Sequence, residues 1–128
     1  MGLLCFRLSN RPGIADPAGK HIEGVFRDFG VRSTRAVRTS RLYLIELDPE
    51  VSDLSIPQRI ASELLADPVV EAVEIITPDT KLTDSGESLA VEVHPKPGVM
   101  DSVAESTRLA LADMGIRVRS VRTGRRFE

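Results

Sequence analysis

One stretch occurs twice in this chain, and the repeat limits the possible folds more than any other feature. The first copy spans residues 11–39 and the second spans residues 96–123. Each begins with a basic residue and Pro-Gly, continues with an aspartate and a helical pattern that ends in glycine, and finishes with Val-Arg-Thr. The corresponding residues lie 85 positions apart up to the final glycine and 84 apart after it: Pro12/Pro97, Gly13/Gly98, Asp16/Asp101 and Gly30/Gly115. The chain is therefore predicted to contain two copies of one fold unit.

The helical patterns of the two copies also correspond. Their stripe positions follow the spacing i, i+3, i+4, i+7 that is typical of one buried helix face: Ile22, Val25, Phe26 and Phe29 in the first copy, and Thr107, Ala110, Leu111 and Met114 in the second. We therefore expect both stripes, including Phe26, to lie in the hydrophobic core.

Composition places the chain in a broad class. A length of 128 residues with 41% hydrophobic residues is enough for one domain or two small ones. The single cysteine, Cys5, leaves no internal disulfide framework and fits a reducing compartment, so we expect a cytoplasmic protein. The sequence has no apolar run of membrane-spanning length and no signal-peptide pattern. A net charge of −2 and few aromatic residues argue against nucleic-acid binding.

The first unit is predicted to have the order β-α-β(β)-α-β. Strands are expected at residues 3–8, 42–47 and 69–76, and an extended stretch at residues 31–39. Helices are expected at residues 17–29 and 57–66. Residues 42–47 are apolar on both faces, which favours a central strand. We assign residues 1–77 to a complete unit, residues 78–88 to a linker, and residues 89–128 to a second, partial unit.

The second unit is about half complete. A strand at 89–93, a helix from its cap at Asp101 to Met114, and an extended segment at 117–122 are followed by no second helix. Such a unit leaves a strand edge and one helix face uncovered. Either another subunit completes the sheet, or the sequence is the front part of a longer polypeptide, and we favour the longer polypeptide.

Few residues are candidates for chemistry. Asp16 and Asp101 follow turns that lead into helix N-termini, where phosphate often binds. Each aspartate already places a carboxylate on the free backbone N–H groups, so helix capping is the better interpretation. His21, His94 and Cys5 have no partners at metal-ligand or catalytic spacing. We therefore predict no catalytic residue, no metal ligand and no cofactor-binding residue in this chain.

Arginine is unevenly placed. Nine of the seventeen basic residues are arginines in corresponding places of the two copies: Arg32, Arg35, Arg38, Arg41, Arg117, Arg119, Arg122, Arg125 and Arg126. They could form a solvated strand edge that is protected by charge, or a surface for an acidic partner. A nucleotide phosphate is a third possibility. The candidate partner-binding residues are Arg35, Arg38, Arg41, Arg119, Arg122 and Arg125.

The repeated motif resembles PurS, the small subunit of formylglycinamide ribonucleotide amidotransferase (phosphoribosylformylglycinamidine synthase). Residues 65–71, Leu-Ala-Asp-Pro-Val-Val-Glu, also resemble the end of PurS, where a helix gives way to a final strand. The tandem arrangement is similar to long forms of the synthetase, in which a doubled PurS-like region precedes the PurL body. The resemblance covers nearly the whole chain, as one full unit and half of another.

The resemblance implies an α+β fold of tandem PurS-like β-α-β(β)-α-β units, with an antiparallel sheet, helices on one face and an incomplete second unit. It implies a non-catalytic module of de novo purine biosynthesis that bridges a PurQ-like glutaminase and a PurL-like synthetase. A PurL-like synthetase fused to this chain is one arrangement that the resemblance implies, and a separate subunit is the other. The assembly would use ATP, magnesium and glutamine, none of them bound by this chain. A homo-oligomer is expected, without nucleic acid or membrane. The β-α-β order also suits an ACT-like module that binds a small regulatory ligand, and this alternative stays open.

Overall fold

The fold contains nine helical and strand segments among the residues that the structure describes. This computed structural model describes residues 2–11, 13–30, 36–51, 53–67, 69–77, 90–96 and 98–128. In chain order the elements are β1 (Leu3–Asn10), α1 (Pro17–Asp28), β2 (Thr39–Leu47), α2 (Ile56–Arg59), its continuation as the π-helix η1 (Ile60–Leu65), β3 (Glu71–Ile76), β4 (Val91–Val93), α3 (Ser102–Asp113) and β5 (Val118–Phe127).

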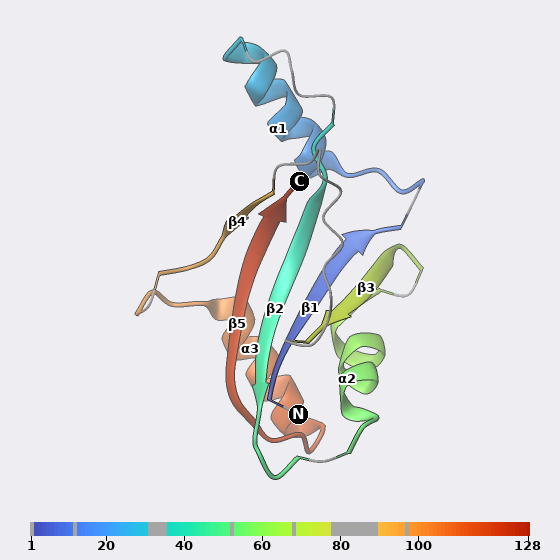
Figure 1. The fold of residues 1–128 in the computed structure, drawn as a ribbon, viewed down its shortest axis with the longest axis vertical. Helices are drawn as coiled ribbons and strands as arrows, with labels where there is room; N and C mark the ends of the chain where they lie inside the picture. Colours follow the sequence, from blue (N-terminus) through green and yellow to red (C-terminus); the bar gives the residue numbers. More distant parts are fainter. Residues whose placement is uncertain are drawn as a thin grey trace.

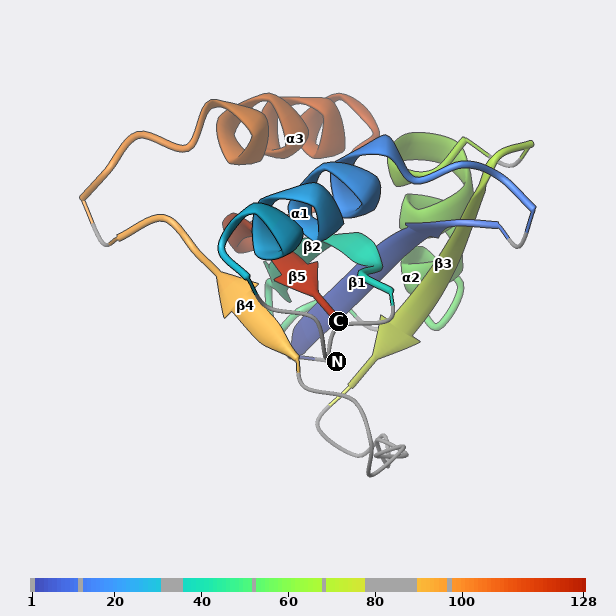
Figure 2. The same ribbon diagram turned by 90° about the horizontal axis from the view of Figure 1, so that it is seen from above.

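The strands form one sheet. Its order is β3-β1-β2-β5-β4, and every neighbouring pair is antiparallel. Helix α1, the continuous α2–η1 helix and helix α3 lie on the same side of this sheet (Figures 1 and 2). The predicted α+β fold, with an antiparallel sheet and helices on one face, is confirmed. The strand predicted over residues 42–47 is central, as expected, because both of its faces are apolar.

Two sequence predictions are changed or left open by this architecture. The end of the predicted extended stretch and the following strand form one strand, β2, which begins at Thr39. Most of that extended stretch, residues 31–35, lies outside the described residues. The predicted linker, residues 78–88, also lies outside them, so the proposed domain boundaries stay a prediction.

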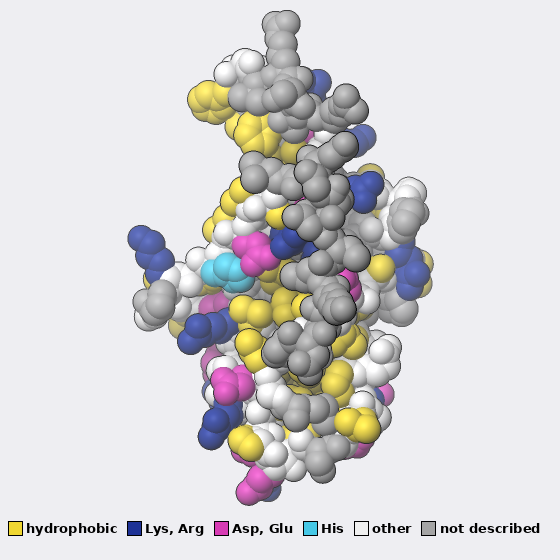
Figure 3. All heavy atoms as spheres, viewed as in Figure 1, with side chains coloured by type: hydrophobic (Ala, Val, Ile, Leu, Met, Phe, Trp, Pro, Cys, Tyr) yellow, Lys and Arg dark blue, Asp and Glu magenta, His cyan; other side chains and the backbone are white. Residues whose placement is uncertain are grey.

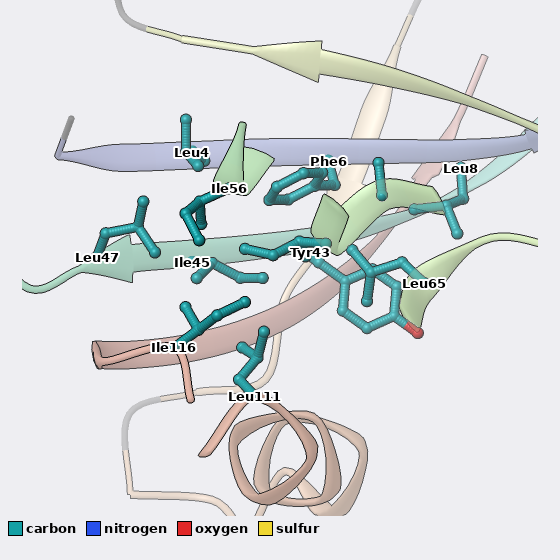
Figure 4. Close-up of a cluster of buried hydrophobic side chains, with 12 residues drawn as sticks. Leu4, Phe6, Leu8, Tyr43, Ile45, Leu47, Ile56, Leu65, Leu111 and Ile116 are labelled. Carbon is teal, nitrogen blue, oxygen red and sulfur yellow. The ribbon is translucent and has the colours of Figure 1, made fainter. Parts of the chain in front are cut away.

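The hydrophobic core lies between strands β1 and β2 on one side and the helices α2–η1 and α3 on the other (Figure 4). On β1 every second residue points to the helices, so Leu4, Phe6 and Leu8 are at most 3% exposed. Ile45 of β2 and Leu111 of α3 meet them from the neighbouring elements and are fully buried. The α2–η1 helix closes the cluster with four residues: Ile56, Ile60, Ala61 and Leu65.

Helix α1 does not bury the stripe that its sequence predicts. Phe26 is 39% exposed and Phe29 is 80% exposed, and Gly19 is the only buried residue of the helix. In Figure 1 the helix extends past the end of the sheet. At the positions of α3 that correspond to Ile22 and Phe26, Thr107 and Leu111 are 8% and 0% exposed. The stripe prediction is therefore right for α3 and wrong for α1, because only α3 has a sheet surface beneath its stripe.

Candidate functional site

The two copies meet along the ladder between β2 and β5. Near one end of this ladder Arg41 is paired with Arg125, which is the residue equivalent to Arg41 in the second copy. On either side, the pairs Thr39–Phe127 and Tyr43–Thr123 join equivalent positions in the opposite sense. The ladder is therefore arranged about a pseudo-twofold axis through the Arg41–Arg125 pair, so the duplicated sequence pairs with itself as two identical strands would.

The first copy of the motif ties a helix to a strand through one carboxylate. The Gly19 backbone N–H donates to Asp16 Oδ1 at 3.0 Å, which caps α1. The Thr39 N–H donates to Asp16 Oδ2 at 2.7 Å, and the Thr39 hydroxyl donates to Oδ1 at 2.8 Å. Asp16 therefore holds the start of α1 against the start of β2.

The second copy repeats this arrangement with the same three kinds of donor group. The Ala104 N–H donates to Asp101 Oδ1 at 3.0 Å. The Thr123 N–H and hydroxyl donate to Asp101 Oδ2 at 3.0 and 2.7 Å. Because both carboxylates already accept three hydrogen bonds each, the capping interpretation explains these turns without a phosphate. These hydrogen bonds from threonine to aspartate explain why both copies of the repeat end in a threonine.

The caps also set the charge state of the two aspartates. Burial raises the pKa of the Asp101 carboxyl, but the hydrogen bonds from Ala104 and Thr123 outweigh burial and hold that pKa below its ordinary value of 3.8. The same balance, with Gly19 and Thr39 as donors, lowers the pKa of Asp16. Both side chains are therefore carboxylates at neutral pH.

Two glycines of α1 provide a matched test of how closely this helix approaches Val37, which lies just before β2. A Cβ at Gly19 would lie 2.2 Å from the Val37 carbonyl oxygen, so Gly19→Ala requires a backbone shift and is expected to lower the free energy of unfolding by about 1–3 kcal/mol. A Cβ at Gly24 would meet nothing within 4 Å, so Gly24→Ala is expected to raise it by up to about 1 kcal/mol. Urea midpoints measure both effects. Equal midpoints for the two variants would contradict the close approach of α1 at Gly19.

Five of the six candidate partner-binding arginines are described by the structure, and they lie along or next to the pseudo-twofold ladder. Arg41 is ion-paired with Glu71 and faces Arg125. Arg122 pairs with Leu44 in the ladder and is exposed, and Arg119 lies 3.9 Å from Glu46. Arg38 exchanges two backbone hydrogen bonds with Glu128, at 2.8 and 2.9 Å, and its side chain is exposed. Arg35 lies outside the described residues.

The strand-edge interpretation of these arginines is wrong. β2 is the central strand, and β5 lies between β2 and β4, so neither strand is an edge of the sheet. Alternation along a strand also sends Arg122 and Arg125 to opposite faces of β5. The five described arginines are therefore spread along one ladder, and they do not form a single flat patch. Their role in partner binding stays a prediction.

A cluster that the sequence analysis missed lies on the face of the sheet opposite the helices. Glu92 accepts a hydrogen bond from Arg126 Nη1 at 2.8 Å, and its other oxygen lies 3.1 Å from His94 Nε2. Burial raises the pKa of Glu92, but the hydrogen bonds from His94 and Arg126 outweigh it and leave the pKa below the ordinary value of 4.5. Only the β4–β5 register brings these residues together, so no spacing in the sequence could have indicated the cluster.

The surroundings of Cys5 fit a packed, unreactive thiol. Cys5 is half-buried on the same face, and burial raises the pKa of its thiol above 9.0, so the reactive thiolate is a minor form at neutral pH. Among the described residues, no three His, Cys, Asp or Glu side chains are grouped so that they could hold a metal ion.

Among the residues that the structure describes, no helix combines the length and apolar character needed to cross a membrane. A hollow of about 400 Å³ lies beside Arg41, His94 and Arg125.

The fold and the repeated aspartate links define a small α+β module built from a duplicated strand-helix-strand unit. A model of the PurS family, described as phosphoribosylformylglycinamidine (FGAM) synthase, matches residues 7–78, which is more than half of the chain. The chain belongs to the PurS family. A comparison with curated proteins gave no match.

The chain is also similar to several solved structures. PurS from B. subtilis is 18% identical with a TM-score of 0.54, and the match covers 59% of this chain and 96% of that one. A chain in the structure of PurLQS from Thermotoga maritima is 29% identical with a TM-score of 0.50, over 59% of this chain and 98% of that one. PurS from Methanocaldococcus jannaschii, a subunit of formylglycinamide ribonucleotide amidotransferase in the purine biosynthetic pathway, is 22% identical with a TM-score of 0.48, over 59% and 94% of the two chains.

Proposed function

We propose that this chain is a non-catalytic assembly module of phosphoribosylformylglycinamidine synthase that bridges the PurQ-like glutaminase and the PurL-like synthetase. The observation that carries the proposal is the family match over residues 7–78, together with the similarity to nearly the full length of a chain in the PurLQS structure. The ATP, magnesium and glutamine of the reaction would be handled by the other parts of the assembly.

The arrangement of charges supports a docking role. The exposed arginines along the β2–β5 ladder offer positive charge on a sheet that is rigid because both strands are paired on both sides. Charges of this kind at an interface mainly accelerate association and select a partner of opposite charge. An acidic surface on the synthetase or the glutaminase is therefore the partner chemistry that fits.

Co-migration in size-exclusion chromatography tests the proposal. The chain is expected to elute with its cognate PurL-like and PurQ-like proteins in the presence of glutamine and nucleotide. The double variant Arg38→Glu with Arg122→Glu is expected to weaken this binding by roughly tenfold or more, because reversed charges oppose association. Circular dichroism checks that the double variant keeps its fold.

Arg108→Glu is the matched control, because Arg108 is an exposed arginine on α3, away from the ladder, where it pairs with Glu105. It is expected to leave the affinity unchanged. Failure of the unmodified chain to co-migrate would remove the assembly function. Equal losses for the control and the double variant would show that the ladder arginines have no specific role.

A further inference from the structure

The second copy has counterparts for only part of the first. The pair Val93–Arg125 repeats the pair Leu8–Arg41, so β4 and β5 stand to each other as β1 and β2 do. Helix α3 likewise corresponds to α1, with the same cap. No counterpart of α2, η1 or β3 follows β5 among the described residues.

The apolar residues that are exposed in this half correspond to core residues of the other half. Val91 and Val93 of β4 are 50% and 56% exposed, whereas Phe6 and Leu8 at the same positions of β1 are 0% and 1% exposed. Phe26 is 39% exposed, whereas its counterpart Leu111 is fully buried. Figure 3 shows hydrophobic side chains at the surface of the end of the molecule where α1 projects. Six residues form what we call the completion surface: Ile22, Val25, Phe26, Phe29, Val91 and Val93.

The first unit shows what covers such a surface. There the second half of β2 supplies Ile45 and Leu47, the α2–η1 helix packs over Phe6 and Leu8, and β3 pairs along the outer side of β1. The outer side of β4 corresponds to that side of β1, and no described strand pairs with it. Within the described part of the chain it is therefore a free edge of the sheet. Both the apolar face and the unpaired strand edge are thus features that a further chain segment would satisfy.

We propose that the completion surface binds a strand–helix–strand segment from outside residues 1–128, with the element order of residues 45–76. Its first strand would extend β5 beyond Glu128, which forms the last backbone pair of that strand with Arg38. Its helix would place an aliphatic face on Phe26, Val91 and Val93. Its second strand would pair antiparallel with the free edge of β4, as β3 pairs with β1.

A second copy of this chain is a poorer occupant. Each copy carries one α2–η1–β3 set, and that set is already used: Ile60 and Ala61 are 0% and 2% exposed, and β3 is paired with β1. In a dimer, the second unit of each copy would therefore still lack counterparts of α2, η1 and β3. The stripes of the two copies could pack on each other, but neither half-sheet would be completed.

The experiment appends a second copy of residues 45–77 directly after Glu128, because Glu128 stands at the position equivalent to Leu44. The expected result is that hydrogen exchange of the α1 amides slows by at least about tenfold, since the helix becomes part of a packed unit. The amides of β1 and β2 serve as the internal reference for the fold. No synthetase or glutaminase is present, so the outcome is independent of the proposed function.

Two matched variants locate the effect. Phe26→Asp in the extended chain, and an aspartate in place of Ile60 in the added copy only, should each return α1 exchange to the rate of the natural chain. Phe26→Asp in the natural chain should leave the β1 and β2 amides unchanged. Unchanged α1 exchange in the extended chain with intact β1 and β2 protection would overturn the proposal. A natural chain that dimerises through α1, and that Phe26→Asp makes monomeric, would also overturn it and assign the surface to a second copy.

Discussion

Phe6→Ala is expected to lower the free energy of unfolding by about 3–5 kcal/mol. Phe6 is fully buried on β1, where it lies in the cluster formed with Ile45 of β2 and with the α2–η1 helix. Removing the ring loses its burial and leaves a cavity that the surrounding strands cannot close, because the sheet holds them in register. Urea denaturation followed by circular dichroism measures the change.

Phe29→Ala is the matched control for this prediction. Phe29 is 80% exposed just after α1, so the same substitution should change the free energy of unfolding by no more than about 0.5 kcal/mol. Phe26→Ala should likewise cost far less than Phe6→Ala, although the sequence pattern predicts a core position for Phe26. Comparable losses at Phe6 and Phe29 would mean that α1 packs in solution and that the core is wrongly located.

Asp101→Ala is expected to lower the free energy of unfolding by about 2–4 kcal/mol. The substitution removes the cap of α3, which contributes about 1 kcal/mol on its own. It also removes the acceptor of the Thr123 N–H and hydroxyl, and a part-buried donor without a partner adds a further cost of about 1–3 kcal/mol. Asp16→Ala removes the equivalent bonds but should cost less, because α1 packs against little else. Equal losses would contradict this difference between the helices.

The same aspartates predict an acid-sensitive stability. Their folded-state pKa values lie below the unfolded value of about 3.9, so the stabilisation is fully present above that value. It is lost as the pH falls through 3.9 toward the lower folded pKa, because protonated carboxyls cannot accept all three hydrogen bonds. Free energies of unfolding measured between about pH 6 and pH 3 should therefore fall less for Asp101→Ala than for the unmodified chain. Parallel curves would show that Asp101 is not linked to folding in this way.

Local signals in the sequence account for the elements and their ends. The Pro-Gly turns, the capping aspartates and the terminal glycines locate both α1 and α3, because each signal acts within one turn of the chain. Gly30 and Gly115, for example, have φ values of 80° and 77°, which only glycine adopts easily. The apolar residues 42–47 identify the central strand for a similar reason: burial on both faces needs no knowledge of which strands are the neighbours.

What the sequence by itself determined is the duplication, the elements of each copy and the α+β fold class with its incomplete second unit. Only the tertiary structure decided that the copies pair through β2 and β5 about Arg41 and Arg125, and that the arginines lie on interior strands. It also decided that the stripe of α3 is buried while that of α1 is not. The physical reason is that amphipathic spacing reports which face of a helix can be buried, whereas actual burial depends on whether a sheet surface lies beneath that face.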